Sequence, residues 1–292
     1  MVLPVFYGIF AGAAGGVSGA GYFGGGSSPR TTVVDRFLFS DDSRTTLGTG
    51  LSVARNDLAA MASSDAGYFG GGSTGSNVAT VDRFLFSDDS RTTLGTGLST
   101  ARRWLAGMAS AVAGYMGGGY NTADVLTTTV DRFLFSNDSR TTLGTGLSAG
   151  TGGMAAMASA DAGYFAGGNV SGAVATVDRF LFSNDSRTTL GTGLSSARYG
   201  AAGMASAVAG YIGGAGTTVD RFLFSNDSRT TLGTGLSVAR TYLGGMASAD
   251  AGYFAGGSVT TVDRFLFSDD SRTTLATGLS VAVSGNAGMA SS

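Results

Sequence analysis

Short apolar stretches separated by small and polar residues recur along the whole chain. In the third of six similar units these stretches span residues 107–112, 114–118, 129–135 and 141–147. Runs rich in Thr, Val, Phe, Tyr and Leu, bounded by Gly, Ser, Asn and Asp, are typical of β-strands joined by turns. Alternation in the third stretch places Val130 and Leu134 on one face and Phe133 and Phe135 on the other. Because both faces are partly apolar, we expect each sheet to be covered on both sides.

The sequence Val-Asp-Arg-Phe-Leu-Phe-Ser occurs six times and serves as a ruler for the repeat. Its aspartates, spaced 47, 49, 47, 42 and 43 residues apart, are Asp35, Asp82, Asp131, Asp178, Asp220 and Asp263. A period in the forties is typical of propeller blades or of helical repeat pairs. No stretch has the length or the 3.6-residue periodicity of a helix. The pattern therefore predicts an all-β fold of six four-stranded antiparallel units.

The order of motifs within each unit resembles the Kelch repeat. The resemblance rests on a Tyr-containing strand that ends in a Gly doublet (115–118), a Val-x-x-aromatic strand (130–133), a turn, a Leu strand, and a closing Ala-Arg pair (101–102). It covers residues 15–292 and implies a six-bladed β-propeller. The chain departs from the family in two ways, since Thr-Thr-Leu replaces the usual Trp of the fourth strand and two units lack the Ala-Arg pair.

The two ends of the chain indicate how the ring closes. Residues 288–292 match a first strand with no second strand after it, and the first unit begins with only a degenerate first strand. We expect the C-terminal strand to complete the first blade and to hide an open sheet edge. Residues 1–14 are predicted to form an apolar N-terminal arm ahead of a propeller spanning 15–292. The arm has no positive region and is shorter than the ~20 residues that a membrane helix needs.

Composition then narrows the possible chemistry. All 18 cations are Arg and all 20 anions are Asp, and the chain contains no His, Cys, Lys, Glu or Gln. Without His and Cys there is no ordinary zinc, copper or haem site, no Ser-His or Cys-His nucleophile pair, and no disulfide. The net charge of -2, with Arg and Asp interleaved, gives no basic field for nucleic acid. We expect no cofactor, no bound metal and no membrane insertion.

Differences between the units gather in two connections that leave each blade on one face. The connections from strand 4 to the next strand 1, and from strand 2 to strand 3, vary in sequence and length, whereas the other two turns are nearly constant. Variable loops on a rigid scaffold are common recognition surfaces, and Trp, Tyr and Arg often anchor them. Neutral loop drift is the alternative explanation. The candidate binding residues are Arg55, Asn56, Asp57, Arg102, Arg103, Trp104, Tyr120, Tyr199 and Tyr242.

Polar residues that recur in every unit favour structural roles. One Ser-Asn/Asp-Asp-Ser turn supplies too few oxygens for Ca²⁺, whereas Asn and Asp form good turns by bonding their own backbone. The Asp-Arg of strand 3 and the Arg after the turn predict a ladder of ion pairs within or between blades. Sixfold repetition of these groups also argues against an active site, which needs one asymmetric arrangement of residues.

Two classes of function follow. The first is a non-catalytic propeller that binds a protein or a glycan, or forms a structural part of an assembly. Similar Gly/Ser/Thr-rich units of bacterial and phage proteins imply a virion or extracellular surface setting. The second is a carbohydrate-active enzyme that uses Asp, Arg and Tyr. The Tyr, His and Cys copper chemistry of galactose oxidases is excluded by the missing His and Cys.

Overall fold

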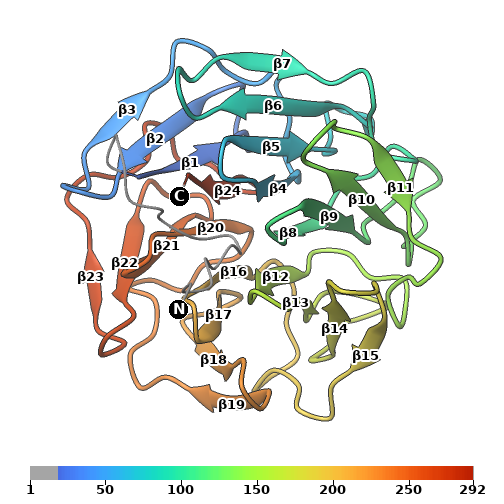
Figure 1. Cartoon of the computed structure of the whole chain (residues 1–292). Coiled ribbons are helices and arrows are strands. Elements are labelled where there is room, and N and C mark those ends of the chain that lie inside the picture. The colour runs from blue at the N-terminus through green and yellow to red at the C-terminus, as the bar shows by residue number, and fades with distance from the viewer. Residues whose placement is uncertain (1–18, 292) are drawn as a thin grey trace, which may run out of the picture.

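The computed structural model describes residues 19–291 and consists of six four-stranded antiparallel sheets arranged around a central axis (Figure 1). This is the predicted six-bladed β-propeller. Blade 1 contains β24 and β1–β3, and blades 2 to 6 contain β4–β7, β8–β11, β12–β15, β16–β19 and β20–β23. The predicted N-terminal arm, residues 1–14, lies outside the described residues.

Each blade runs from an inner strand of small residues to a short polar outer strand. The inner strands are β24 (Ala287–Ala290), β4 (Ala59–Ala62), β8 (Ala106–Ala109), β12 (Ala155–Ala158), β16 (Ala202–Ala205) and β20 (Leu243–Ala247). The second strands are β1 (Ala20–Gly24), β5 (Ala66–Gly70), β9 (Ala113–Gly117), β13 (Ala162–Ala166), β17 (Ala209–Gly213) and β21 (Ala251–Gly256). Both sets are almost entirely buried, because neighbouring blades cover both faces of each sheet.

The outer half of each blade carries the repeated heptapeptide and the turn that follows it. The third strands are β2 (Val34–Leu38), β6 (Val81–Leu85), β10 (Val130–Leu134), β14 (Val177–Leu181), β18 (Val219–Leu223) and β22 (Val262–Leu266). The outer strands are β3 (Arg44–Thr46), β7 (Arg91–Thr93), β11 (Arg140–Thr142), β15 (Arg187–Thr189), β19 (Ser228–Thr231) and β23 (Arg272–Thr274).

The first and fourth predicted strands are shorter in the structure than the sequence indicates. In blade 3 the first strand ends at Ala109 rather than at 112, because the Ser110 hydroxyl bonds the backbone of Ala113 and forms a turn. The fourth ends at Thr142 rather than at 147. The Gly-Thr-Gly that follows is a bend, which turns the chain away from the sheet.

The ends of the chain meet in blade 1, as predicted. Strand β24 pairs antiparallel with β1, with Met289 opposite Tyr22, and Figure 1 shows the two strands side by side near the axis. Beyond them the Ser291 amide donates to the Ala20 carbonyl at 2.7 Å. Residues more than 260 positions apart thus share one sheet, and this pairing closes the ring.

Apolar side chains fill the space between blades. Between blades 3 and 4, for example, Met108 and Tyr115 pack in one cluster with Phe165 and Phe180. Gly163 is required in this layer, because a Cβ there would lie 2.2 Å from the Met108 sulfur. The small residues of the repeat therefore let neighbouring sheets approach, while Met, Tyr and Phe provide the core.

A ladder of polar contacts also joins each blade to the next and confirms the predicted ion pairs. Tyr164 of blade 4 donates its hydroxyl to Asp227 of blade 5 at 2.9 Å, and Arg179 pairs with the same carboxylate at 2.6 Å. The same contacts join blade 6 to blade 1, where Tyr253 and Arg264 both bind Asp42 at 2.8–2.9 Å. The Asp in each Ser-Asn/Asp-Asp-Ser turn therefore accepts bonds from the preceding blade, which confirms a structural role for these turns.

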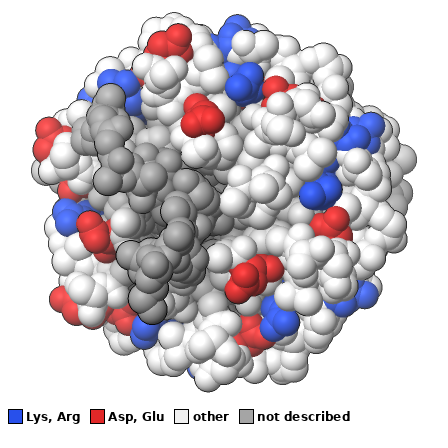
Figure 2. Space-filling view, viewed as in Figure 1, with Lys and Arg blue, Asp and Glu red and all other residues white. Residues whose placement is uncertain are grey.

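The face seen in Figure 2 is mostly uncharged, with red and blue residues interspersed and no continuous basic area. No group of three acidic residues among residues 19–291 is arranged to hold a metal ion. No helix in that part of the chain is long and apolar enough to cross a membrane.

Candidate functional site

The two classes of variable connection lie together on one face, as the sequence predicts. Isolated β-bridges join them, linking Asn56 to Ser73 and Arg103 to Tyr120. In each pair the first residue lies just before the inner strand of a blade, and its partner lies just after the neighbouring strand of the same blade. Sequence differences between the units are therefore gathered into one surface around the axis.

A closed ring of backbone hydrogen bonds surrounds the axis on this face. The six residues that form it lie one or two positions before the inner strands and have φ between 58° and 68°. Each donates its N–H to the carbonyl of its counterpart in the preceding blade, over 2.6–2.9 Å. The ring consists of Asp57, Trp104, Gly153, Gly200, Tyr242 and Gly285. The backbone of the ring has nearly the same conformation and hydrogen bonds at all six positions, so any asymmetry at the axis comes from the side chains.

Two ring side chains, Trp104 and Tyr242, come from the opposite blades 3 and 6 and meet at the axis as part of a group of four aromatic residues. The Trp104 ring lies 5.7 Å from Tyr120, 6.2 Å from Tyr199 and 5.2 Å from Tyr242, measured between centroids. Tyr199 and Tyr242 are 6.1 Å apart. The four residues come from blade 3 and from the connections into blades 3, 5 and 6. We call them the axial aromatic cluster.

Glycine in the ring makes this arrangement possible. A Cβ on Gly200 would lie 3.0 Å from the Tyr242 ring and 2.5 Å from the Thr241 hydroxyl, and Gly153 lies under the edge of Trp104. The cluster is only partly buried, and Tyr199 keeps 36% of its surface exposed. The rings therefore pack against one another and still offer surface to a partner.

Charged groups border the cluster on its outer side. The Arg103 guanidinium stacks over Tyr120 at 5.2 Å, pairs with Asp124 at 2.8 Å, and donates to the Asn77 side chain at 3.0 Å. These contacts hold Arg103 in one orientation while leaving it partly exposed. Asp124 and Asn77 belong to this surface but were not among the predicted site residues. Their only sequence signal is that they lie in the variable loops between second and third strands.

Asp57 is the one acidic residue of the ring. Burial raises its pKa to about 6, although a hydrogen bond from Trp104 and the charges of Arg103 and Arg30 act in the opposite direction. Its carboxylate accepts a bond from the Asn56 amide at 2.7 Å. Asn56 also accepts a bond from Arg30 at 2.9 Å. Asp57 therefore lies in the ring at the axis, and Asn56 precedes it in the same connection, where both take part in a chain of polar contacts.

Below the ring a narrow channel follows the axis. Asp57, Trp104 and Tyr242 line a cavity of about 80 Å³ at its mouth, and the Ala and Gly residues of the inner strands line another of about 80 Å³ further in. The floor of the upper cavity is apolar except at Asn286. Apolar walls with a few polar groups at one end are typical of ligand sites, although each cavity is small.

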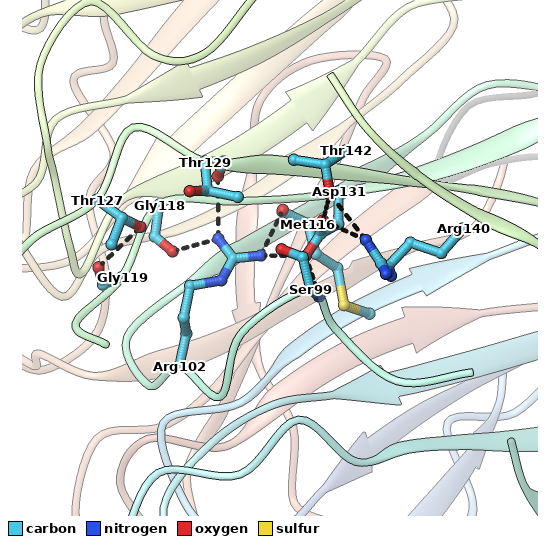
Figure 3. A network of polar contacts seen from close by, with 10 residues as sticks. All are labelled: Ser99, Arg102, Met116, Gly118, Gly119, Thr127, Thr129, Asp131, Arg140 and Thr142. Carbon is cyan, nitrogen blue, oxygen red and sulfur yellow. Dashed lines mark hydrogen bonds and ion pairs between the residues drawn. The ribbon is translucent and has the colours of Figure 1, made fainter. Parts of the chain in front are cut away.

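Two of the predicted binding residues are wrong for that role. Arg55 and Arg102 are fully buried, so neither reaches a partner on the surface. Figure 3 shows why: Arg102 is paired with Asp131 at 2.6 Å and donates to the carbonyls of Gly118 and Thr129 at 2.7 and 2.9 Å. The arginine of the Ala-Arg pair points inward and fastens one connection to the next sheet.

Comparison with known proteins shows the fold and no family. No family model matches the chain, and no curated protein matches it. A solved structure titled "Structure of YjhT" is similar with a TM-score of 0.73 and 14% sequence identity, over 90% of this chain and 95% of that one. At this identity the similarity shows the propeller fold alone, and the Kelch resemblance stays a prediction.

The raised pKa of Asp57 leads to a testable dependence of stability on pH. The folded value of about 6 lies above the unfolded value of about 3.9, so ionised Asp57 destabilises the fold, and this cost disappears as the pH falls from 6 towards 4. We expect Asp57→Asn to raise the melting temperature at pH 7.5 and to have little effect at pH 4. Calorimetry across this range checks the prediction, with exposed Asp65→Asn as the control. A difference in melting temperature between Asp57→Asn and the wild type that does not change with pH would contradict the prediction.

Proposed function

We propose that this chain is a non-catalytic, Kelch-like β-propeller that binds a protein or a glycan through its axial aromatic cluster. One observation carries the proposal. Three of the six ring positions are Gly, and the aromatic side chains at two of the others pack with two tyrosines of the variable connections into one group of four rings. Loop drift alone gives no reason for rings from separate connections to converge.

The chemistry of the cluster suits a partner with apolar surface and polar groups around it. Trp, Tyr and Arg are the residues that most often dominate binding energy, particularly where aromatic anchors are surrounded by polar contacts. Here Arg103, Asp124 and Asn77 lie beside the rings, and Asp57 lies at the axis. Aromatic faces and planar polar groups serve equally for a peptide or for a sugar.

The setting that we propose is a virion or an extracellular surface. It rests on the resemblance of the units to Gly/Ser/Thr-rich Kelch-like repeats of bacterial and phage proteins. The sparse charge of the chain, 13% of residues, is compatible with packing against other subunits. A partner protein in an assembly and a surface glycan are the two occupants that we test.

The chain is well suited to a direct binding assay, because Trp104 is its only tryptophan. Intrinsic fluorescence therefore reports on the proposed site without labelling. We expect a glycan or protein that binds there to shift or quench the emission with saturation. Screening on a glycan array, followed by fluorescence titration of each hit, measures the affinity.

Substitution of Trp104 separates binding from folding. Trp104→Gly introduces the residue that the ring already carries at Gly153, Gly200 and Gly285, so the backbone with φ near 60° is preserved. We expect affinity for an array hit to fall by about 30-fold or more, as for a binding hot spot, with little change in melting temperature. Because this variant lacks the reporter, its binding is measured by calorimetry.

The control for this prediction is Val238→Ala, which changes an exposed side chain in the connection from blade 5 to blade 6. That variant is expected to bind as the wild type does. If Trp104→Gly binds with unchanged affinity, the cluster is not the site. If it unfolds, the cluster is a packing element.

A carbohydrate-active enzyme is the second candidate, and the raised pKa of Asp57 favours it. Glycoside hydrolysis, however, normally uses two carboxyl groups about 5–9.5 Å apart, and among residues 19–291 Asp57 is the only acid lining the axial cavity. Incubating array hits with the protein and analysing the products by mass spectrometry tests this alternative. Turnover that is abolished by Asp57→Asn would replace the binding proposal.

A further inference from the structure

The mouth of the axial cavity has an aromatic side and an acidic side. Trp104 leans towards blade 4 and Tyr242 towards blade 5, where a Cβ on Gly200 would lie 3.0 Å from the Tyr242 ring. Asp57 leans towards blade 1, where a Cβ on Gly285 would collide with its Oδ1. Blade 1 lies across the axis from blade 4 (Figure 1). The two rings and the carboxylate therefore approach the same cavity from different sides.

Below this mouth the cavity is apolar. Its floor is made by the residues that follow the ring in four blades, Leu58, Leu105, Met154 and Leu243. Asn286 also lines it, but its amide donates to the Ala255 carbonyl of the neighbouring blade at 3.4 Å. The volume of about 80 Å³ exceeds that of two water molecules, each of which takes about 30 Å³ in the liquid. The cavity therefore has room for a small group with an apolar surface.

The Asp57 carboxylate brings a negative charge to this mouth. Its hydrogen bonds come from the Asn56 amide at 2.7 Å and from the Trp104 indole. The charges of Arg30 and Arg103 act on it, but among residues 19–291 neither forms an ion pair with it. Because an ionised carboxylate accepts about four hydrogen bonds, Asp57 can still bind a further partner. Burial raises its pKa only to about 6, so the group is ionised at pH 7.5.

We propose that the axial cavity binds a methylated ammonium group, of the kind that choline and trimethyllysine carry. This inference rests on the proposed binding site and names the chemical group that enters it. The positive charge is attracted by the aromatic rings of Trp104 and Tyr242 and by the Asp57 carboxylate. The methyl groups pack on the apolar floor. A primary ammonium suits the cavity less well, because its three N–H groups need acceptors that the side chains of the floor do not provide.

Charge also distinguishes this group from a neutral ligand of the same shape. A neutral group that displaced water from the mouth would leave Asp57 desolvated and without a counter-charge, which is costly. A methylated ammonium group supplies that counter-charge and has methyl groups of the same size. We therefore expect the site to select the cation over its uncharged analogue.

Titration of the Trp104 emission at pH 7.5 and constant ionic strength tests this selectivity. The probes are choline and 3,3-dimethylbutan-1-ol, in which a carbon atom replaces the charged nitrogen. We expect choline to bind about tenfold more tightly than this neutral analogue, and ethanolamine, the primary ammonium, to bind more weakly than choline. The single indole N–H signal of Trp104 in NMR spectra gives a second readout of the same binding.

Substitution of Asp57 separates charge from shape. Asp57→Asn keeps the size of the side chain, so we expect it to lower the affinity for choline by about fivefold or more and to change that for the neutral analogue little. Asp65→Asn is the matched control, because it also removes one negative charge but from an exposed turn on the opposite face. This control should bind choline as the wild type does.

Equal affinities for choline and its neutral analogue would overturn the inference. So would the absence of any saturable change in both the emission and the indole signal, or full choline affinity in Asp57→Asn. Phosphocholine and a trimethyllysine peptide then distinguish a decorated glycan from a protein as the source of the group, and tighter binding of either than of choline supports the inference. If glycan-array hits bind at Trp104 but choline does not displace them, the ammonium inference is wrong and the proposed function stands. If choline binds and neither a glycan nor a protein does, the inference holds and the proposed function is wrong.

Discussion

Deletion of residues 287–292 is expected to lower the melting temperature by about 10 °C or more and to cause the chain to associate. The deletion removes β24, the inner strand of blade 1, together with buried Met289. Loss of such a side chain alone costs about 2–5 kcal/mol, and 1 kcal/mol corresponds to roughly 2–4 °C in a chain of this size. The edge of β1 then becomes free to pair with another molecule.

Calorimetry and light scattering after size exclusion measure the two effects of this deletion. Deleting only residues 291–292 is the control, because it leaves β24 intact while removing the contacts of Ser291 with Ala20. That shorter deletion should remain monomeric and lose little stability. If the protein without 287–292 also stays monomeric with an unchanged melting temperature, ring closure by β24 contributes little.

Much of the fold can be predicted directly from the sequence, because the same strand and turn residues recur in all six units. Strand alternation, turn residues and the unpaired segment at 288–292 lead to six blades and to closure of the first blade by β24. Strand ends are predicted less well. Whether Gly144 continues a strand or bends the chain depends on contacts that the local sequence does not contain.

The candidate site was only partly predictable for a related reason. The variable loops correctly identified the face and included Trp104 and the three tyrosines among the candidates, but they gave no sign that these rings meet, and Arg55 and Arg102 were assigned to the surface. These two arginine side chains point inward because they pair with Asp82 and Asp131, which lie 27 and 29 residues further along the chain. A signal was present, because an Arg that recurs at one place in four units is more typical of scaffold than of a single site.

Arg55→Met is expected to destabilise the protein by about 3–5 kcal/mol. Arg55 and Asp82 are fully buried and 3.0 Å apart, and removing one partner leaves an uncompensated buried charge. Burial raises the pKa of Asp82, but hydrogen bonds from Thr93 and Ser52 and the charge of Arg55 outweigh it and hold the pKa below its usual value. The stability from this depressed pKa is present above the unfolded value of about 3.9 and is lost as the pH falls through the folded value.

Without Arg55, protonation of Asp82 relieves the buried charge, so the difference in stability between the wild type and Arg55→Met should narrow from pH 7 to pH 4. Chemical denaturation at both pH values measures it. Arg91→Met is the matched control: Arg91 lies 3.5 Å from the other oxygen of the same carboxylate but is 28% exposed. Because exposed pairs contribute about 0–1 kcal/mol, this variant should lose far less stability. Equal losses from the two variants would show that burial does not set the strength of these pairs, and the structural role assigned to the inward-pointing arginines would then be wrong.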